Sequence, residues 1–593
     1  MNQKPAMPDQ KNFILAIALS MAIIFAWQYF YAAPQSKQAQ QATQQQVTQQ
    51  LGQQAQVPGS ATATDVSDRQ VTIAATARAP IETSALEGSI NLVGAQIDDL
   101  KLKNYRETAS PTSPIITFLS PAGTANSYFA EQGVVAAAGQ TLKLPDSKSL
   151  WSVPAGAKLT EATPLTLTWD NGEGLIFHRE ISVSNDYVFT VKQTIENKSQ
   201  AAAIVLPYAR IQRQDTPHVA GYYTFFEGLL GVQNGKLQEV HYSDVAKEDG
   251  KITSDAKGGW LGFTDKYWAT ALIPDQARNL TATYQHFKVG TRDAYQTDYL
   301  ATEPLVIAPG SSATLEDHLF AGAKIVGTID EVGAKFGIEK FDLMIDWGWF
   351  KFLTQPMFYL IEWCKGIMGN FGLAILLVTV IVKLAVFPLA NKSYASMSKM
   401  KKLQPEMERI KAEAGDDRMK MQQAMMELYK KEKVSPMSGC LPIFVQIPIF
   451  FALYKVILTT IELRHAPFYG WIHDLSAPDP TSLFNLFGLI PWNPPHLLML
   501  GIWPILMGIT MWVQMRLNPA PADPIQASMF NWMPLIFTFM LGSMPAGLVI
   551  YWTWSNLLSI IQQSYIMKKN GVDVDLIGNI RDSLPGLKKK PAT

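Results

Sequence analysis

Long apolar stretches recur along this chain and dominate its hydropathy pattern. Six of them are about as long as the roughly 20 residues that span the hydrocarbon core of a bilayer. They occupy residues 12–31, 371–390, 438–460, 497–516, 529–544 and 546–566. The pattern predicts an α-helical polytopic membrane protein with six transmembrane helices.

A long segment of different character separates the first apolar stretch from the second. Residues 32–61 are glutamine-rich, with 12 Gln among the 22 residues 35–56, a composition that predicts an unfolded linker. In residues 62–327, runs rich in Thr, Val and aromatic residues are punctuated by Asn-Gly and Asn-Asp pairs, which are hairpin signals. The clearest runs are 165–169, 175–183 and 187–195. The segment predicts one large all-β sandwich.

Aromatic residues crowd the stretch 328–370, with Lys351, Glu362 and Lys365 between them. This mixture predicts an amphipathic helix that lies in the headgroup region of a membrane. A core helix of the sandwich is the alternative interpretation, and both stay open at this point.

Residues 391–437 carry apolar positions at helical spacing on both sides of Gly415, which predicts a helical hairpin. A methionine-rich face of such a hairpin can be an adaptable contact surface. Alternatively, the two stripes pack against each other. The methionines concerned are Met397, Met400, Met407, Met421 and Met425.

Charge is balanced overall, with 50 Lys and Arg against 50 Asp and Glu, so only its local distribution informs. Residues 391–434 hold 11 basic and 7 acidic residues, and the tail 567–593 holds 6 and 3. Basic excess marks the cytoplasmic side, which places residues 1–11, the hairpin and the tail inside and the loop 461–496 outside. The stretch 12–31 is then an uncleaved anchor, although a cleaved signal peptide is the competing interpretation.

Lys383 lies within the second apolar stretch, where a charge costs roughly 3 kcal/mol on insertion scales and marks a functional site by default. The predicted topology brings other polar residues to the same inner half of the membrane. We expect them to line a hydrated groove open to the cytoplasm; the alternative is that Lys383 snorkels and the others join helices. The predicted groove residues are Lys383, Thr379, Gln446, Thr510, Gln514, Tyr551, Trp552, Ser555 and Asn556, with Gln562 and Gln563 nearby.

Signals of enzymatic chemistry are missing from the sequence. The two cysteines, Cys364 and Cys440, are too few for a disulfide framework or a cysteine-rich metal site, and no phosphate-binding G-x-x-x-x-G-K-[ST] motif occurs. We therefore expect no catalytic residue, no metal, no cofactor and no small-molecule substrate. A secondary transporter that uses Lys383 for anion or proton binding is the main alternative function, and an intramembrane hydrolase is a weaker one.

Four segments make the chain recognisable: 392–429, 436–450, 471–476 and 533–563. They resemble the YidC membrane protein insertases of Gram-negative bacteria, in the YidC/Oxa/Alb superfamily. The resemblance follows the whole chain in order, including the anchor, the large periplasmic domain and the five-helix core.

The resemblance implies a function in the bacterial inner membrane. A membrane-embedded cation in a hydrophilic groove would attract the extracytoplasmic segment of a nascent membrane protein, alone or beside the Sec translocon. Implied partners are nascent membrane-protein substrates, the Sec translocon, the ribosome, components of the signal-recognition pathway and membrane lipids. Family members usually carry arginine where Lys383 stands, and we expect this lysine to stay charged because the groove is wet.

Overall fold

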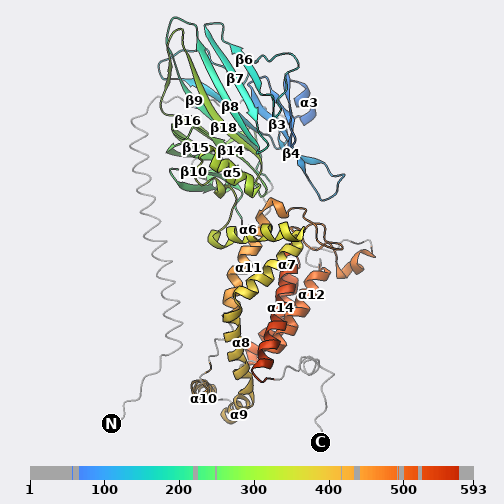
Figure 1. Ribbon diagram of the computed structural model, residues 1–593. Coiled ribbons are helices and arrows are strands. Elements are labelled where there is room, and N and C mark those ends of the chain that lie inside the picture. The colour runs from blue at the N-terminus through green and yellow to red at the C-terminus, as the bar shows by residue number, and fades with distance from the viewer. Residues whose placement is uncertain are drawn as a thin grey trace, which may run out of the picture.

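The computed structural model describes residues 66–217, 225–247, 250–415, 417–432, 441–490, 500–518 and 524–572, together with Val57, Val434 and Trp492. A β-rich part occupies one end of the molecule, and a set of helices occupies the other (Figure 1). The predicted anchor 12–31, nearly all of the linker 32–61 and the tail beyond residue 572 lie outside the described residues.

The β-rich part consists of two antiparallel sheets. The first sheet has the order β1 (Arg78–Glu82), β2 (Leu86–Asn91), β3 (Gln96–Arg106), β5 (Tyr128–Ala136), β9 (Ala203–Gln214), β16 (Arg292–Ala301), β15 (Asn279–Val289) and β12 (Lys251–Lys257), with β4 (Ile115–Leu119) on β3 and β17 (Leu305–Ile307) on β9. The second has the order β11 (Lys236–Val240), β10 (Gly228–Gln233), β13 (Trp260–Thr264), β14 (Trp268–Ile273), β18 (Ser312–Ala323), β8 (Val188–Asn197), β7 (Leu175–Val183) and β6 (Leu165–Asp170). Two short helices, α3 (Arg69–Ala74) and α4 (Tyr242–Val245), accompany the sheets.

The two sheets pack face to face, which confirms the predicted sandwich. The Tyr128 hydroxyl on β5 lies 2.6 Å from the Thr270 hydroxyl on β14, so a hydrogen bond joins the inner faces. One apolar cluster takes buried residues from both sheets. The core also contains a buried ion pair between Arg210 and Glu131, at 2.8 Å. Such a pair is costly to bury and depends on good geometry.

The predicted hairpins lie in the second sheet. Strand β6 pairs with β7 from Leu165 opposite Ile181, and the chain turns through Asn171 and Gly172, where Gly172 has a φ of 72°. Strand β7 then pairs with β8, with Val183 opposite Phe189. Buried and less buried residues alternate along β7, as expected of a strand with one face in the core.

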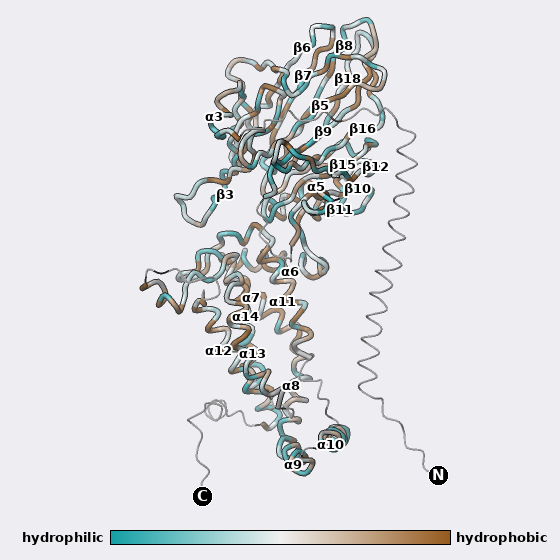
Figure 2. The backbone as a smooth tube through the Cα atoms, turned by 180° about the vertical axis from the view of Figure 1, so that it is seen from behind, coloured by the Kyte–Doolittle hydropathy of each residue, from teal (hydrophilic) through white to brown (hydrophobic). Residues whose placement is uncertain are grey.

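The helical part begins after the sandwich and runs to the end of the described chain. Its helices are α5 (Val326–Phe336), η2 (Phe341–Met344), α6 (Lys351–Met368), α7 (Phe371–Ala385), α8 (Phe387–Lys402), α9 (Gln404–Ala414), α10 (Arg418–Lys431), α11 (Leu441–Thr459), η4 (Ile461–Leu463), η5 (Leu483–Gly488), α12 (Ile502–Leu517), α13 (Pro524–Leu541) and α14 (Ala546–Lys569). Figure 2 shows that hydrophobic residues dominate α7 and α11 to α14, whereas α9 and α10 at the far end are largely hydrophilic.

A sharp corner separates α6 from α7. Gly369 ends α6 with a left-handed φ of 69°, and the Asn370 side chain caps α7 by accepting a hydrogen bond from the Leu373 N–H at 3.1 Å. Among the described helices, none alone is long and apolar enough to cross a membrane. Helices α6 and α7 are long and apolar enough only when taken together, and the pair is bent by 118°. The six transmembrane helices therefore remain a prediction.

The predicted span 371–390 is divided between two helices. Helix α7 ends at Ala385, and α8 begins at Phe387 with Pro388 in its first turn. Proline has no N–H to continue the hydrogen bonding of α7 and is favoured at a helix start, which explains the break. Residues 391–402 thus extend α8, and the hairpin itself is formed by α9 and α10.

Three polar contacts hold α11 and the segment after it against the sandwich and against the residues that directly follow the sandwich. The Lys455 Nζ on α11 lies 2.7 Å from the Asp346 carboxylate, between η2 and α6. The Glu462 Oε1 accepts a hydrogen bond of 2.8 Å from the N–H of Val326, the first residue of α5. Arg464 donates to two backbone carbonyls at the end of β3, the shorter bond being 2.6 Å.

Candidate functional site

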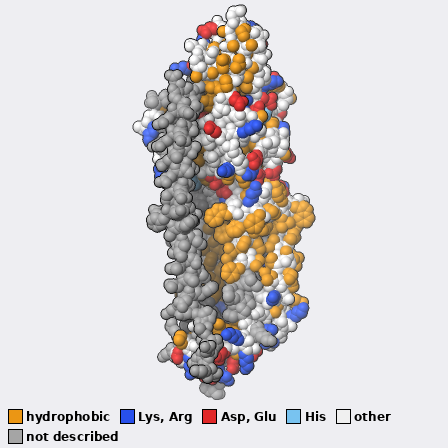
Figure 3. Space-filling view, turned by 90° about the vertical axis from the view of Figure 1, so that its left-hand side faces the viewer, with side chains coloured by type: hydrophobic (Ala, Val, Ile, Leu, Met, Phe, Trp, Pro, Cys, Tyr) orange, Lys and Arg blue, Asp and Glu red, His pale blue; other side chains and the backbone are white. Residues whose placement is uncertain are grey.

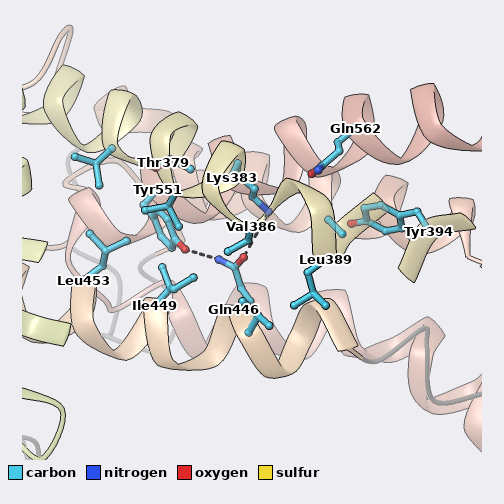
Figure 4. Close-up of a pocket in the computed structure, with 14 residues that line it drawn as sticks. Thr379, Lys383, Val386, Leu389, Tyr394, Gln446, Ile449, Leu453, Tyr551 and Gln562 are labelled. Atoms are coloured by element: carbon cyan, nitrogen blue, oxygen red, sulfur yellow. Dashed lines mark hydrogen bonds between the residues drawn. The ribbon is translucent and has the colours of Figure 1, made fainter. Parts of the chain in front are cut away.

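Lys383 lies in the last turn of α7 and is half-buried between three helices. Its Nζ donates a hydrogen bond of 2.7 Å to the Ser559 Oγ on α14 and a longer one of 3.4 Å to the Gln446 Oε1 on α11. The break after Ala385 places Lys383 where α7 gives way to α8. Figure 4 shows its amine pointing toward Gln446.

Gln446 extends this network toward α14. Its Nε2 donates to the Tyr551 hydroxyl and, at 3.4 Å, to the Ser555 Oγ. Ser559 accepts from Lys383 and in turn donates to the Ser555 carbonyl at 2.8 Å. Tyr551, Ser555 and Ser559 are four residues apart, so they share one face of α14. The network thus ties α7, α11 and α14 together through polar side chains.

A cavity adjoins this network, with an empty volume of about 580 Å³ that includes space open to solvent. Its polar lining comes from Lys383, Thr379, Tyr394, Gln446, Tyr551 and Gln562, and its apolar lining comes mainly from Val, Leu and Ile residues of α7, α8 and α11. Thr379 is buried and donates to the Ile375 carbonyl one turn earlier, at 2.7 Å. Figure 4 shows these side chains pointing toward one another from α7, α11 and α14.

The amine of Lys383 has neutral hydrogen-bond partners among the described residues. Within the described part of the chain, its hydrogen-bond partners are a hydroxyl and an amide oxygen. Neither partner carries a charge that would pair with the lysine. Across the same residues, no group of three or more His, Cys, Asp or Glu side chains is arranged to hold a metal ion.

Comparisons with known proteins cover nearly the whole chain. Residues 363–572 match the family model described as 60Kd inner membrane protein, and residues 78–360 match the YidC periplasmic domain. The chain is 51% identical over 610 residues to the membrane protein insertase YidC of Bradyrhizobium diazoefficiens, covering 97% of this chain and 98% of the relative. It is 50% identical over 598 residues to that of Rhizobium meliloti, covering 99% and 100%.

The chain belongs to the YidC family of membrane protein insertases. Among solved structures, a crystal structure of an active YidC insertase with the first transmembrane domain resolved also matches, at 18% identity and a TM-score of 0.34, over 81% of this chain and 90% of the other. YidC relatives are named insertases. The family therefore favours the predicted insertase function over the secondary transporter. It also places the protein at the inner membrane with a periplasmic domain.

Not all the predicted groove residues lie at one place in this YidC member. Lys383, Thr379, Gln446 and Tyr551 line the cavity, and Ser555 joins them through Gln446. The others do not line the cavity: Thr510 and Gln514 lie on α12, and Trp552 and Asn556 lie on α14.

That second group has its own contacts. The Asn556 Nδ2 donates to the Thr510 Oγ1 at 3.3 Å and so links α14 to α12. Trp552 packs against Phe450, with ring centroids 4.7 Å apart, and against Phe537. Gln514, half-buried on α12, does not line the cavity. The interpretation that some of these residues join helices therefore describes Thr510 and Asn556 well.

Sequence reasoning missed Ser559, the nearest partner of the Lys383 amine. A signal was available, because Ser559 follows Tyr551 and Ser555 at the same spacing of four on α14. Tyr394 on α8 was also missed, although it lines the cavity. Because the predicted span ends at residue 390, Tyr394 was assigned to the cytoplasmic hairpin and was not considered for the groove.

The methionines of the predicted contact surface mainly pack inside the protein. Met400, Met407 and Met425 form a buried cluster, and Met421 packs against it. Met397 lies in another buried cluster, with Tyr394 and Ile566. The exposed methionines of α10 are instead Met419 and Met426.

Proposed function

We propose that this protein inserts nascent membrane proteins into the inner membrane by means of the cation of Lys383. The observation that carries the proposal is a lysine at the edge of a cavity between apolar helices, with neutral hydrogen-bond partners. An acidic or polar segment of a substrate would enter this cavity and have only part of the bilayer left to cross. Two opposite charges 4 Å apart attract by about 4 kcal/mol at an effective dielectric constant of about 20.

The topology we propose has six spans with both termini in the cytoplasm, as the distribution of charge predicts. The basic residues of α9 and α10 then face the cytoplasm, and the sandwich faces the periplasm. The cavity lies near α8, which leads to the cytoplasmic hairpin, so a substrate would enter from that side. The ribosome and components of the signal-recognition pathway would meet the protein at the hairpin and at the basic tail, and the Sec translocon would act beside it.

The apolar segment of the substrate would leave along the lipid-facing sides of α11 and α13. Exposed apolar side chains mark these sides: Phe444, Ile447 and Phe451 on α11, and Met529, Trp532, Leu535, Ile536, Phe539 and Met540 on α13. Burial of the segment in lipid yields about 0.8 kcal/mol per CH₂. The membrane potential adds about 2.3 kcal/mol per elementary charge moved through 100 mV.

Charge substitutions at Lys383 test the proposal in cells depleted of the native protein. Lys383→Arg should support insertion of a short-tailed inner-membrane protein, because it keeps the charge. Lys383→Ala should be impaired, with a loss of up to about 4 kcal/mol of attraction, and Lys383→Glu should be inactive because it repels acidic segments. Lys392→Glu is a matched control, since this lysine is exposed on α8.

Insertion is read from protease accessibility of the substrate's extracytoplasmic tail, and thermal unfolding of each purified variant checks its fold. Rescue by Lys383→Glu equal to rescue by Lys383→Arg would refute charge attraction.

A further inference from the structure

The loop between α11 and α12 exposes an unusual run of large apolar side chains. Six of the eight residues 483–490 are exposed and apolar: Leu483, Phe484, Leu486, Phe487, Leu489 and Ile490. Leu489 is the most exposed of them, at 84%. Single exposed apolar residues are ordinary, but a contiguous group marks an interaction surface.

The base of this loop is held in place by a buried carboxylate. Asp479 is only 2% exposed and accepts hydrogen bonds from the Trp471 Nε1, the Thr481 N–H and the Trp503 N–H, at 3.0–3.1 Å. The Leu483 N–H also donates to the Leu500 carbonyl at 2.9 Å. The apolar segment therefore projects from a fixed base at the start of α12.

The backbone of the segment is strained where it turns. Leu486 and Phe487 have φ values of 48° and 58°, in the left-handed region that bulky residues avoid at a cost of roughly 1–2 kcal/mol each. Glycine or asparagine would form such a turn in water at a lower cost in conformational free energy. Strain of this kind marks functional segments, and here it accompanies the outward display of leucine and phenylalanine.

The chemistry of the loop fits lipid better than a protein partner. Residues 480–515 contain no Asp, Glu, Lys or Arg, so the surface offers no charge to complement a protein. The segment protrudes sideways from the upper end of α12, at about the height of α6, in both Figure 1 and Figure 2. Around α6, Trp349, Phe352 and Trp363 are exposed as well. Figure 3 shows hydrophobic side chains gathered over this level of the molecule.

Helix length gives an independent reason for lipid contact at this height. Helix α12 has 16 residues, which span about 24 Å at 1.5 Å per residue. The hydrocarbon core is about 30 Å thick. With Arg516 at the inner surface, α12 would end several ångströms short of the outer surface, and the apolar loop would fill the remaining layer.

We propose that residues 483–490 insert into the outer leaflet of the bilayer and anchor the outer end of α12 there. The proposal rests on the topology given under Proposed function. Amphipathic anchors of this kind enter the headgroup and acyl boundary by about 5–10 Å.

Depth-dependent fluorescence quenching tests the proposal on the full chain. The protein with Cys364→Ala, Cys440→Ala and Leu489→Cys carries one environment-sensitive label and is reconstituted in phosphatidylcholine–phosphatidylglycerol vesicles. The label should be quenched by shallow spin-labelled lipids and should be protected from iodide. A label at Leu150→Cys, a leucine of the sandwich that is 62% exposed, should show the reverse, and one at Ile536→Cys on α13 should be quenched by lipid.

Iodide quenching at Leu489 equal to that at Leu150 would overturn the proposal. Protection of Leu489 that disappears when the protein is diluted in the vesicles would also overturn it, because that result assigns the surface to a second copy. Neither measurement uses insertion activity, so failure of the Lys383 mechanism and failure of this anchor give different results.

Discussion

Acidity should control how firmly α5, the helix that follows the sandwich, is held against η4, through Glu462. Burial raises the pKa of this carboxyl from 4.5 to about 7, the hydrogen bond from the Val326 N–H opposes that rise, and the charge of Glu362 on α6 adds to it. Tyr105 of β3 and Arg464 also face this site. The second carboxylate oxygen is buried and makes no hydrogen bond to another of the described residues. The folded state therefore favours the protonated acid.

The sign of the effect follows from proton binding. Between pH 4.5 and about 7 the docked state holds a proton that a solvated glutamate has lost. The contribution of Glu462 to the contact between α5 and η4 is thus fully present below pH 4.5, and it is lost as the pH rises through the folded-state pKa of about 7. A rise of about 2.5 units corresponds to roughly 3 kcal/mol at 1.36 kcal/mol per unit. The contact between α5 and η4 should lose most of this stabilisation between pH 5 and pH 8.

Amide hydrogen exchange of α5 measures this change in the full chain held in lipid nanodiscs. After correction for the intrinsic pH dependence of exchange, protection at Val326 and the residues after it should fall from pH 5 to pH 8. Glu462→Gln should remove the dependence, because the amide stays neutral and can still accept from the Val326 N–H. Glu331→Gln, an exposed residue of α5, is the matched control and should leave it unchanged. Equal pH dependence in Glu462→Gln and the native chain would refute the reasoning.

Two further predictions concern the helices. Ser559→Ala removes the nearest partner of the Lys383 amine and should lower stability by about 1.5–3 kcal/mol, the usual worth of a hydrogen bond to a charge; an unchanged melting temperature in detergent would contradict this. Gly508→Ala places a methyl group 2.1 Å from the Thr538 hydroxyl and should destabilise the contact of α12 and α13 by about 1–3 kcal/mol. Thr538→Ala in the same chain should recover most of that loss in thermal unfolding, and a loss that persists would show that the clash lies elsewhere.

The sandwich was predictable where its structure is local. Strands β6, β7 and β8 follow one another, and turn residues such as Gly172 mark the ends of the runs. The order of the sheets was not predictable, because it depends on pairs far apart in the chain. Tyr128 on β5 lies opposite Arg213 on β9, for example, 85 positions along the chain. No local pattern records such a pairing.

The helix boundaries show a similar limit. An apolar stretch gives the approximate place of a helix, but its end depends on single residues that the hydropathy pattern does not weigh. Pro388 ends α7 before the apolar stretch ends, and Gly369 with Asn370 makes the 118° corner before α7 begins. Both signals can be seen in the sequence. How they would bend the chain in space depends on packing against α11 and α14.

Two properties decide whether a polar residue reaches the candidate site: its depth along the helix and the helix face on which it lies. Position along an apolar stretch gives the depth of a polar residue, and depth grouped Lys383 with Thr510 and Asn556. Rotation about the helix decides which neighbour a residue meets, and successive residues differ by about 100°. Ser555 and Asn556 are adjacent and so lie at almost equal depth. Because their side chains point in different directions, Ser555 contacts Gln446 of α11 and Asn556 contacts Thr510 of α12. The spacing of four along α14 could have separated the two faces, but which helix each face meets required the fold. A polar group at the right depth is thus a candidate for the Lys383 cavity only when its helix face points toward α7 and α11.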